Sequence, residues 1–358
     1  MKPNHTPLIL WDWGTAYDLF ASLNVLHYPE KFGLRGSWAA GVRSRLTVAQ
    51  RSILEDAQIV FFSSPLAWVS SLPEPKDADT ALWTLSQIPH GEILPTLAYH
   101  ADEAPEIIAT LKEISAKRSW NEADLERLRN QYHPKEASTH SNFLVTTLEW
   151  WTHPEEFGER YLAALQAYVS VFFAEEERRI KPYLQQALAK AQALEEKLDF
   201  PQLMVELSQG VKLAMLEQAD EVLFVPSYWT TPLMMYDCVI DKHWVVLFGA
   251  RPTDVALVPG EVVPDAMLRA LKALSDPTRL LILRYLSEKP HTPAQLARKL
   301  RLRAPTVIHH LSALRLAGLL YVSMESEDEK HYTVRETAVQ DAFENMRKFL
   351  LLKGDKEE

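Results

Sequence analysis

Two adjacent histidines, His309 and His310, are the residues whose type and spacing first suggest chemistry in this chain. They lie in a segment that reads as a short helix, where successive residues point about 100° apart. Val307 and Leu311 then belong to a buried stripe, while His309 points away from it, about 200° round the helix from Val307. His310 lies at the edge of the stripe, about 60° from Val307 on the other side. The two imidazoles diverge, so the pair is a poor site for one metal ion.

The elements around the histidines predict a helix-turn-helix. Asp276 can cap one helix, and Thr292 with Gln295 forms a T-x-x-Q capping box at the start of the next. A short turn leads to the helix that carries the histidines, and Gly318 ends it. The expected elements are helices at Asp265–Leu274, from Pro277, from Pro293 and at about Pro305–Ala317, then strands at Leu320–Met324 and His331–Val334. Two short helices followed by a β-hairpin are typical of a winged helix, which binds DNA.

The outward face of the second short helix then becomes a candidate reader of base pairs. Thr306 and His309 lie on that face, and Arg303 lies in the turn before it. Arginine is the commonest specific reader of guanine in the major groove. An ordinary solvated helix face is the alternative interpretation. The residues predicted to contact DNA are Arg303, Thr306, His309, His310, Ser312, Lys330 and His331.

Three stretches of this region resemble a known family. "LKALSDPTRLLILRYL", "TPAQLARKLRLRAPTVIHHLSALRLAGLLYV" and "KHYTV" are similar to the arsenic-repressor-like (ArsR) winged-helix regulators, over about residues 265 to 350. The resemblance implies a homodimer that binds a palindromic site on double-stranded DNA. It also implies pairing through Pro264–Leu274 and Val339–Leu352, where Phe343, Met346 and Leu350 form an apolar stripe.

The sequence departs from the family pattern in three places. Arg303, Ala304 and Pro305 stand where the family often has serines, so a polar helix cap is absent. The wing tip "ESEDE" is acidic and should repel phosphates. The cysteine pairs and the histidine-containing last helix of the metal-sensing members are also missing, so we expect no metal and no cofactor.

The preceding 260 residues have a different character. We expect an α+β fold, mostly α, with a small antiparallel sheet from "EVLFVPS", "MMYDCVI" and "HWVVLFG", the last two joined as a hairpin. A long helical stretch at 154–198 should be kinked or divided at Pro182. The expected regions are a helical, aromatic-rich 1–150, long helices plus the sheet at 151–250, a linker at 251–263, the winged helix at 264–352 and a frayed tail at 353–358.

Composition limits the remaining possibilities. Net charge is −10, yet residues 262–358 carry 16 basic against 13 acidic side chains, which is compatible with a polyanion there. A single cysteine, Cys238, and the lack of a signal peptide or an apolar run of about 18 residues predict a cytoplasmic protein without a membrane span.

What the N-terminal region senses is open at this level. All ten tryptophans lie between Trp11 and Trp244, where they form either a bulky core or an effector pocket for an apolar or aromatic molecule. Trp150, Trp151 and Trp229 are the candidates for such a pocket. The sequence lacks a phosphate-binding glycine loop, a G-x-S-x-G motif and H-E-x-x-H, so we expect a regulator and no enzyme. A winged-helix scaffold without DNA binding is the alternative function.

Overall fold

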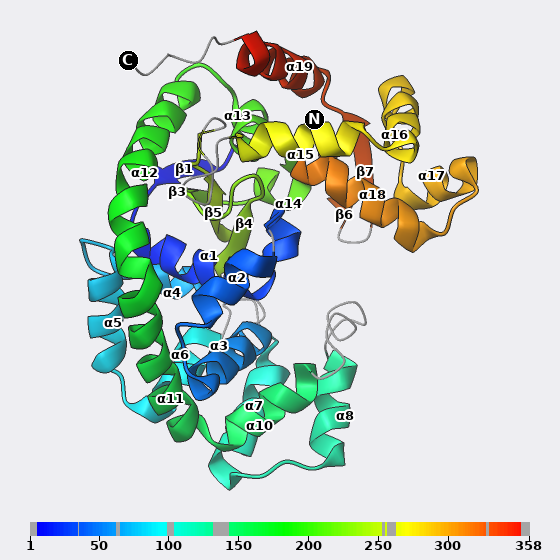
Figure 1. Ribbon diagram of the computed structural model, residues 1–358. Helices are drawn as coiled ribbons and strands as arrows, with labels where there is room; N and C mark the ends of the chain where they lie inside the picture. Colours follow the sequence, from blue (N-terminus) through cyan, green and yellow to red (C-terminus); the bar gives the residue numbers. More distant parts are fainter. Residues whose placement is uncertain are drawn as a thin grey trace, which may run out of the picture.

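The computed structural model describes residues 6–34, 36–61, 65–98, 104–131, 143–252, 255, 263–326 and 329–351. The fold is α+β and mostly α, as the sequence predicts, with helices packed against both faces of a small sheet (Figure 1). The first part of the chain contains β1 (Leu8–Trp11), α1 (Thr15–His27), a 3-10 turn (Pro29–Phe32), α2 (Gly36–Arg43), α3 (Val48–Val60), α4 (Leu66–Ser70), α5 (Ala78–Ser86), α6 (His90–Ala98), α7 (Pro105–Lys117), α8 (Glu122–Gln131) and α10 (Phe143–Thr152).

The middle of the chain completes this N-terminal unit. Its elements are α11 (Pro154–Tyr168), a π-helical turn (Val169–Phe173), α12 (Ala174–Glu195), α13 (Phe200–Leu207), β2 (Val211–Leu213), α14 (Ala214–Glu217), β3 (Glu221–Ser227), β4 (Met235–Ile240) and β5 (His243–Gly249). Among the described residues, every helix is too short or too polar to span a bilayer.

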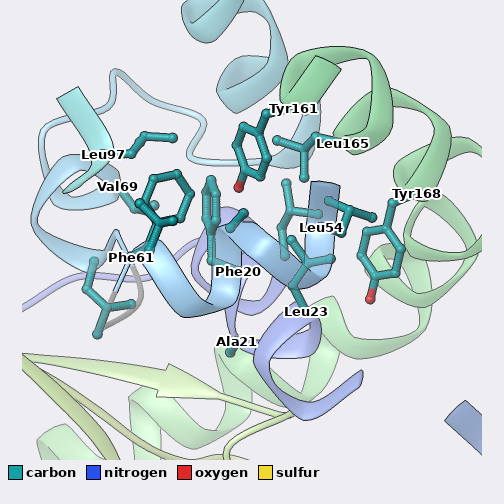
Figure 2. Close-up of a cluster of buried hydrophobic side chains, with 14 of the residues drawn as sticks. Phe20, Ala21, Leu23, Leu54, Phe61, Val69, Leu97, Tyr161, Leu165 and Tyr168 are labelled. Carbon is teal, nitrogen blue, oxygen red and sulfur yellow. The ribbon is translucent and has the colours of Figure 1, made fainter. Parts of the chain in front are cut away.

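The main hydrophobic core joins helices that lie far apart in the sequence. Side chains from α1, α3, α4, α6 and α11 meet in one cluster (Figure 2). Phe61 packs edge-on against Tyr161 with ring centres 5.4 Å apart, and the Tyr168 hydroxyl donates to Ser22 Oγ at 2.9 Å. The same core takes in Val245 and Leu247 of β5. Residues on both sides of position 150 therefore share one core, and the predicted region boundary there stays a prediction.

The sheet is mixed, whereas the sequence predicted an antiparallel one. β4 and β5 form the expected antiparallel hairpin, but β3 runs parallel to β5 and β1 runs parallel to β3, in the order β1-β3-β5-β4. The error has two causes. The four-residue strand β1, "LILW", is too short to be recognised as a strand beside the helical pattern that follows it. In addition, β5 lies between β3 and β4 in the sheet, although β4 follows β3 in the sequence.

The predicted division of the long helical stretch at Pro182 is wrong, while the alternative of a kink there stays a prediction. Pro182 lies inside the continuous helix α12, and it is exposed, so water can solvate the carbonyl that its ring leaves without a partner. The irregular turn of the long helical stretch is the π-helix at Val169–Phe173, between α11 and α12. Proline was the visible breaker in the sequence, but a π-turn has no comparable signature.

The C-terminal unit follows the predicted element order closely. It contains α15 (Asp265–Leu274), α16 (Pro277–Glu288), α17 (Pro293–Leu300), α18 (Ala304–Leu316), β6 (Leu320–Ser326), β7 (Glu329–Val334) and α19 (Glu336–Leu351). Asp276 accepts from Arg279 N, and the capping box of Thr292 and Gln295 is formed in both directions. Its separate core includes Ile282, Leu296, Val307 and Leu311. Of the predicted linker, residues 253, 254 and 256–262 lie outside the described part of the chain, as does the tail at 353–358.

Strand β2 of the N-terminal unit joins the wing of the C-terminal unit. It pairs in parallel with β6, so the second sheet has the order β2-β6-β7. Val322 N donates to Gly210 O at 2.7 Å just before β2 begins. Gly210 has φ +104, and a Cβ there would lie 2.8 Å from Tyr321 Cδ1 and 3.1 Å from Leu320 O. Only glycine meets both the conformation and the close approach of the two backbones.

Replacing Gly210 by alanine should therefore loosen the junction between the units. We expect a loss of about 1–3 kcal/mol in the free energy of unfolding, from the strained backbone and the contact with Tyr321. Urea denaturation measures it. Gly41→Ala is the matched control, because a Cβ at this helical position meets nothing within 4 Å and should stabilise α2 by about 0.5–1 kcal/mol. Equal stability of Gly210→Ala and the parent would contradict the assignment.

Candidate nucleic-acid interface

Local sequence fixes the position of α18 at the edge of the C-terminal unit. Helix α17 ends at Arg301, which adopts the left-handed conformation at φ 56, and Leu302 N returns to Ala297 O at 3.0 Å. Pro305 occupies the first turn of α18, where a missing N–H costs little. Val307, Leu311 and Leu314 are buried, which confirms the predicted apolar stripe.

The opposite face of α18 is open to solvent. Arg303, Thr306 and His309 are all exposed, so the large N-terminal unit does not cover the start of this helix. In Figure 1 the end of α18 next to α17 lies at the edge of the molecule, whereas its other end lies beside β6. This face is therefore open to a binding partner at Arg303, Thr306 and His309.

His310 has different surroundings from His309. Its Nδ1 lies 3.9 Å from Asp276 Oδ1, and only 15% of its side chain is exposed. The backbone N–H of Arg279, and then the charges of Arg279 and His310, hold the pKa of Asp276 below its usual value. The rings of His309 and His310 are 6.0 Å apart and tilted by 63°. Within the described part of the chain, no group of three His, Cys, Asp or Glu could hold a metal ion.

The other predicted contact residues lie on α18 and the wing. Ser312 is exposed on α18, and its Oγ donates to Ile308 O at 2.8 Å. Lys330 is exposed on β7 opposite Met324, while His331 is half-buried opposite Ser323. The side chains of the acidic wing tip, at 325–329, lie outside the described residues.

The segment around this helix is strongly cationic. Between positions 289 and 324 the sequence has six Lys and Arg residues and no Asp or Glu. Four of the six lie close to the turn and are exposed: Arg298, Lys299, Arg301 and Arg303. Such a surface attracts phosphates, although the whole chain carries a net charge of −10.

The three tryptophans proposed for an effector pocket belong to the main core, in two different places. Trp229 is 1% exposed and packs against Trp38, with ring centres 5.3 Å apart, and against Phe172. Trp151 is also buried, whereas Trp150 is half-buried and donates from Nε1 to Asp56 Oδ2 at 3.1 Å.

One residue near the interface escaped the sequence analysis. Arg315 lies towards the C-terminal end of α18, and its guanidinium faces the carbonyls of Ser208 and Gln209 in the N-terminal unit. Burial, and then repulsion by Arg335, lower its pKa to about 10. The sequence did contain a sign of this contact. Arg315 lies four residues after the buried Leu311, on the same side of the helix, and a charge beside an apolar stripe needs a polar partner.

Helix, turn, exposed helix and β-hairpin together define a winged helix-turn-helix domain. Residues 276–322 match the family model described as bacterial regulatory protein, arsR family. This part of the chain is therefore an ArsR-family helix-turn-helix, which agrees with the resemblance seen in the sequence. The family consists of bacterial regulatory proteins. The match therefore supports a role for this chain as a DNA-binding transcriptional regulator.

Similar solved structures also overlap the chain only in part. HlyU from Vibrio cholerae N16961 is 26% identical, with a TM-score of 0.20, over 23% of this chain and 89% of that one. NolR from Sinorhizobium fredii is 24% identical, with a TM-score of 0.21, over 26% of this chain and 94% of that one. No curated protein matches the chain. The N-terminal unit is thus left without a counterpart in the matches described.

Arg303 is the N-cap residue of α18, and its side chain forms no capping hydrogen bond. Arg303→Ser should therefore raise the free energy of unfolding by about 0.5–1 kcal/mol, because the hydroxyl can accept from a free N–H of the first turn. Thermal unfolding of the full chain checks this. Arg301→Ser serves as the control, since it replaces a nearby exposed arginine at a left-handed position that gains no cap. A lower melting temperature for Arg303→Ser would refute the prediction.

Proposed function

We propose that the protein is a DNA-binding transcriptional regulator that inserts α18 into the major groove of a palindromic operator. The observation that carries the proposal is the exposed face of Arg303, Thr306 and His309, within a cationic segment of an ArsR-family helix-turn-helix. Base contacts from Arg303 and His309 give specificity. Lys330 and His331 on the wing contact the phosphate backbone, together with Ser312 and His310 at the flanks of the helix.

The regulator acts as a homodimer. Helix α19 has no buried residue, and Phe343 and Leu350 are 52% and 70% exposed. Helix α15 lies beside α19, but it also faces the N-terminal unit through a contact of 3.8 Å between Arg251 and Asp265. Helix α19 therefore supplies most of the apolar surface for the partner. A two-fold axis there would set two copies of α18 about one DNA turn apart.

The N-terminal unit senses a small apolar or aromatic molecule or mediates assembly. Trp150, Trp151 and Trp229 are the proposed lining, because indole rings suit a ligand of this kind. A ligand regulates DNA binding if it has different affinities for two arrangements of the recognition helices.

Replacing Arg303 or His309 by alanine should weaken operator binding by about 1–3 kcal/mol each, because a bidentate or direct base contact is lost. Fluorescence anisotropy with DNA from the region upstream of the protein's own gene measures the affinity. Arg284→Ala is the matched control, since Arg284 is an exposed arginine on α16 of the same domain. The parent affinity should also fall steeply as salt rises.

Two results of this titration would contradict the proposal. Parent-like affinity in both alanine variants would remove Arg303 and His309 from the interface. Failure of the parent to shift any upstream fragment would instead favour a winged-helix scaffold without DNA binding, for which the acidic wing tip "ESEDE" is the supporting feature.

Phe343→Glu should convert the dimer to a monomer, because it places a charge in the centre of the proposed α19 contact. Sedimentation velocity gives the mass, and operator affinity should fall in parallel. Val48→Glu changes another exposed apolar residue, on α3 far along the chain, and should leave the dimer intact. A parent that is monomeric at all concentrations would rule out this assembly.

A further inference from the structure

A cleft lies at the junction of the two units, behind the recognition helix. It has a volume of about 230 Å³. Its lining comes from β2 and the start of β4 on one side, and from α18 and both strands of the wing on the other. The cleft is separate from the tryptophan-rich core proposed above, because none of the tryptophans lines it.

Most of the lining is apolar. Val211, Leu213 and Met234 contribute from the N-terminal unit, and Leu311, Val322 and Met324 contribute from the winged helix. Methionines adapt their shape to a ligand more readily than branched side chains. A pocket with such walls and a few polar groups is typical of a small-molecule site.

The charged groups of the lining have one sign. Arg315 and Lys330 are its two charged residues, and Tyr236 and Tyr332 add hydroxyl groups. Arg315 has long contacts of 3.4 and 3.5 Å to the carbonyls of Gln209 and Ser208. Among the described residues no carboxylate acts on Arg315, and burial with repulsion by Arg335 lowers its pKa. A desolvated guanidinium without a counter-charge favours binding of an anion.

We propose that this cleft is a second ligand site, apart from the tryptophan-rich core, and that it takes a small apolar carboxylate. The acid group meets Arg315 and Lys330, and the hydrocarbon part lies against Met234, Leu213 and Met324. The bound molecule touches both units, so it acts where β2 pairs with β6.

Occupancy of the cleft weakens DNA binding, an effect that rests on the function proposed above. Lys330 is both a lining residue and a proposed phosphate contact. A carboxylate that holds its ammonium group removes it from the DNA backbone. The ligand also contacts Leu311, Ser312 and Arg315 on α18, so it can shift the helix that reads the bases.

Calorimetry with the full-length protein tests the site without DNA. The probes are octanoate, octylammonium with the same chain and the opposite charge, and acetate with the charge alone. Octanoate should bind at least ten-fold more tightly than either of the others. Equal binding of octanoate and octylammonium would overturn the proposed charge complementarity.

Variants then locate the binding. Met234→Trp should fill the cleft and abolish octanoate binding, while Val48→Trp adds the same ring at an exposed position and should not change it. Lys330→Gln, at an exposed position that does not endanger folding, should reduce the affinity several-fold. Unchanged octanoate affinity in both Met234→Trp and Lys330→Gln would place the ligand elsewhere.

The regulatory step is measured separately by anisotropy with the upstream DNA. Saturating octanoate should lower the DNA affinity of the parent at least five-fold and leave that of Met234→Trp unchanged. Octanoate binding with no change in DNA affinity would overturn the regulatory step and leave the site standing. If the parent binds no upstream DNA, the proposed function fails, and the calorimetry still decides whether the cleft binds carboxylates.

Discussion

The parallel pairing of β2 with β6 is the constraint on which the arrangement of the two units depends. It begins where Val322 N donates to Gly210 O, and it continues in register to Leu213 and Met324. The conformation of Gly210 allows the two backbones to approach closely. Because β6 follows α18 directly, this short strand also sets the orientation of the exposed recognition face relative to the N-terminal unit. A three-residue strand has few hydrogen bonds, and the ligand proposed for the adjacent cleft would act at this pairing.

Charge is distributed unevenly between surface and junction. The exposed cations near the turn, from Arg298 to Arg303, make a surface for phosphates on a chain that is acidic as a whole. Three other arginines lie mostly buried between the units: Arg251, Arg269 and Arg315. Burial lowers the pKa of each, and it does so in places where the winged helix meets the N-terminal unit. Arg251 lies 3.8 Å from Asp265 and donates to Thr231 O, whereas Arg315 has only long contacts to the carbonyls of Ser208 and Gln209.

The elements that were predicted correctly depend on local chemistry. The caps at Asp276 and Thr292, the stop at Gly318 and the stripe of Val307 and Leu311 are all decided within one or two helical turns. The two histidines diverge for the same reason. Two features were not predicted: the parallel position of β3 beside β5, and the π-turn at Val169–Phe173 in a stretch that stays helical through Pro182. Neither leaves a local pattern, because strand order and helix irregularity depend on what packs against them.

The sequence by itself therefore determined a winged helix-turn-helix at the C-terminus and the residue types of its outward face. It did so because helical periodicity and capping operate between near neighbours. Only the tertiary structure decided that β2 completes the wing sheet, that Arg315 turns towards Ser208 and Gln209, and that a cleft lies between the units. The residues of that cleft come from segments about a hundred positions apart, and only the packing of two separate cores brings them together.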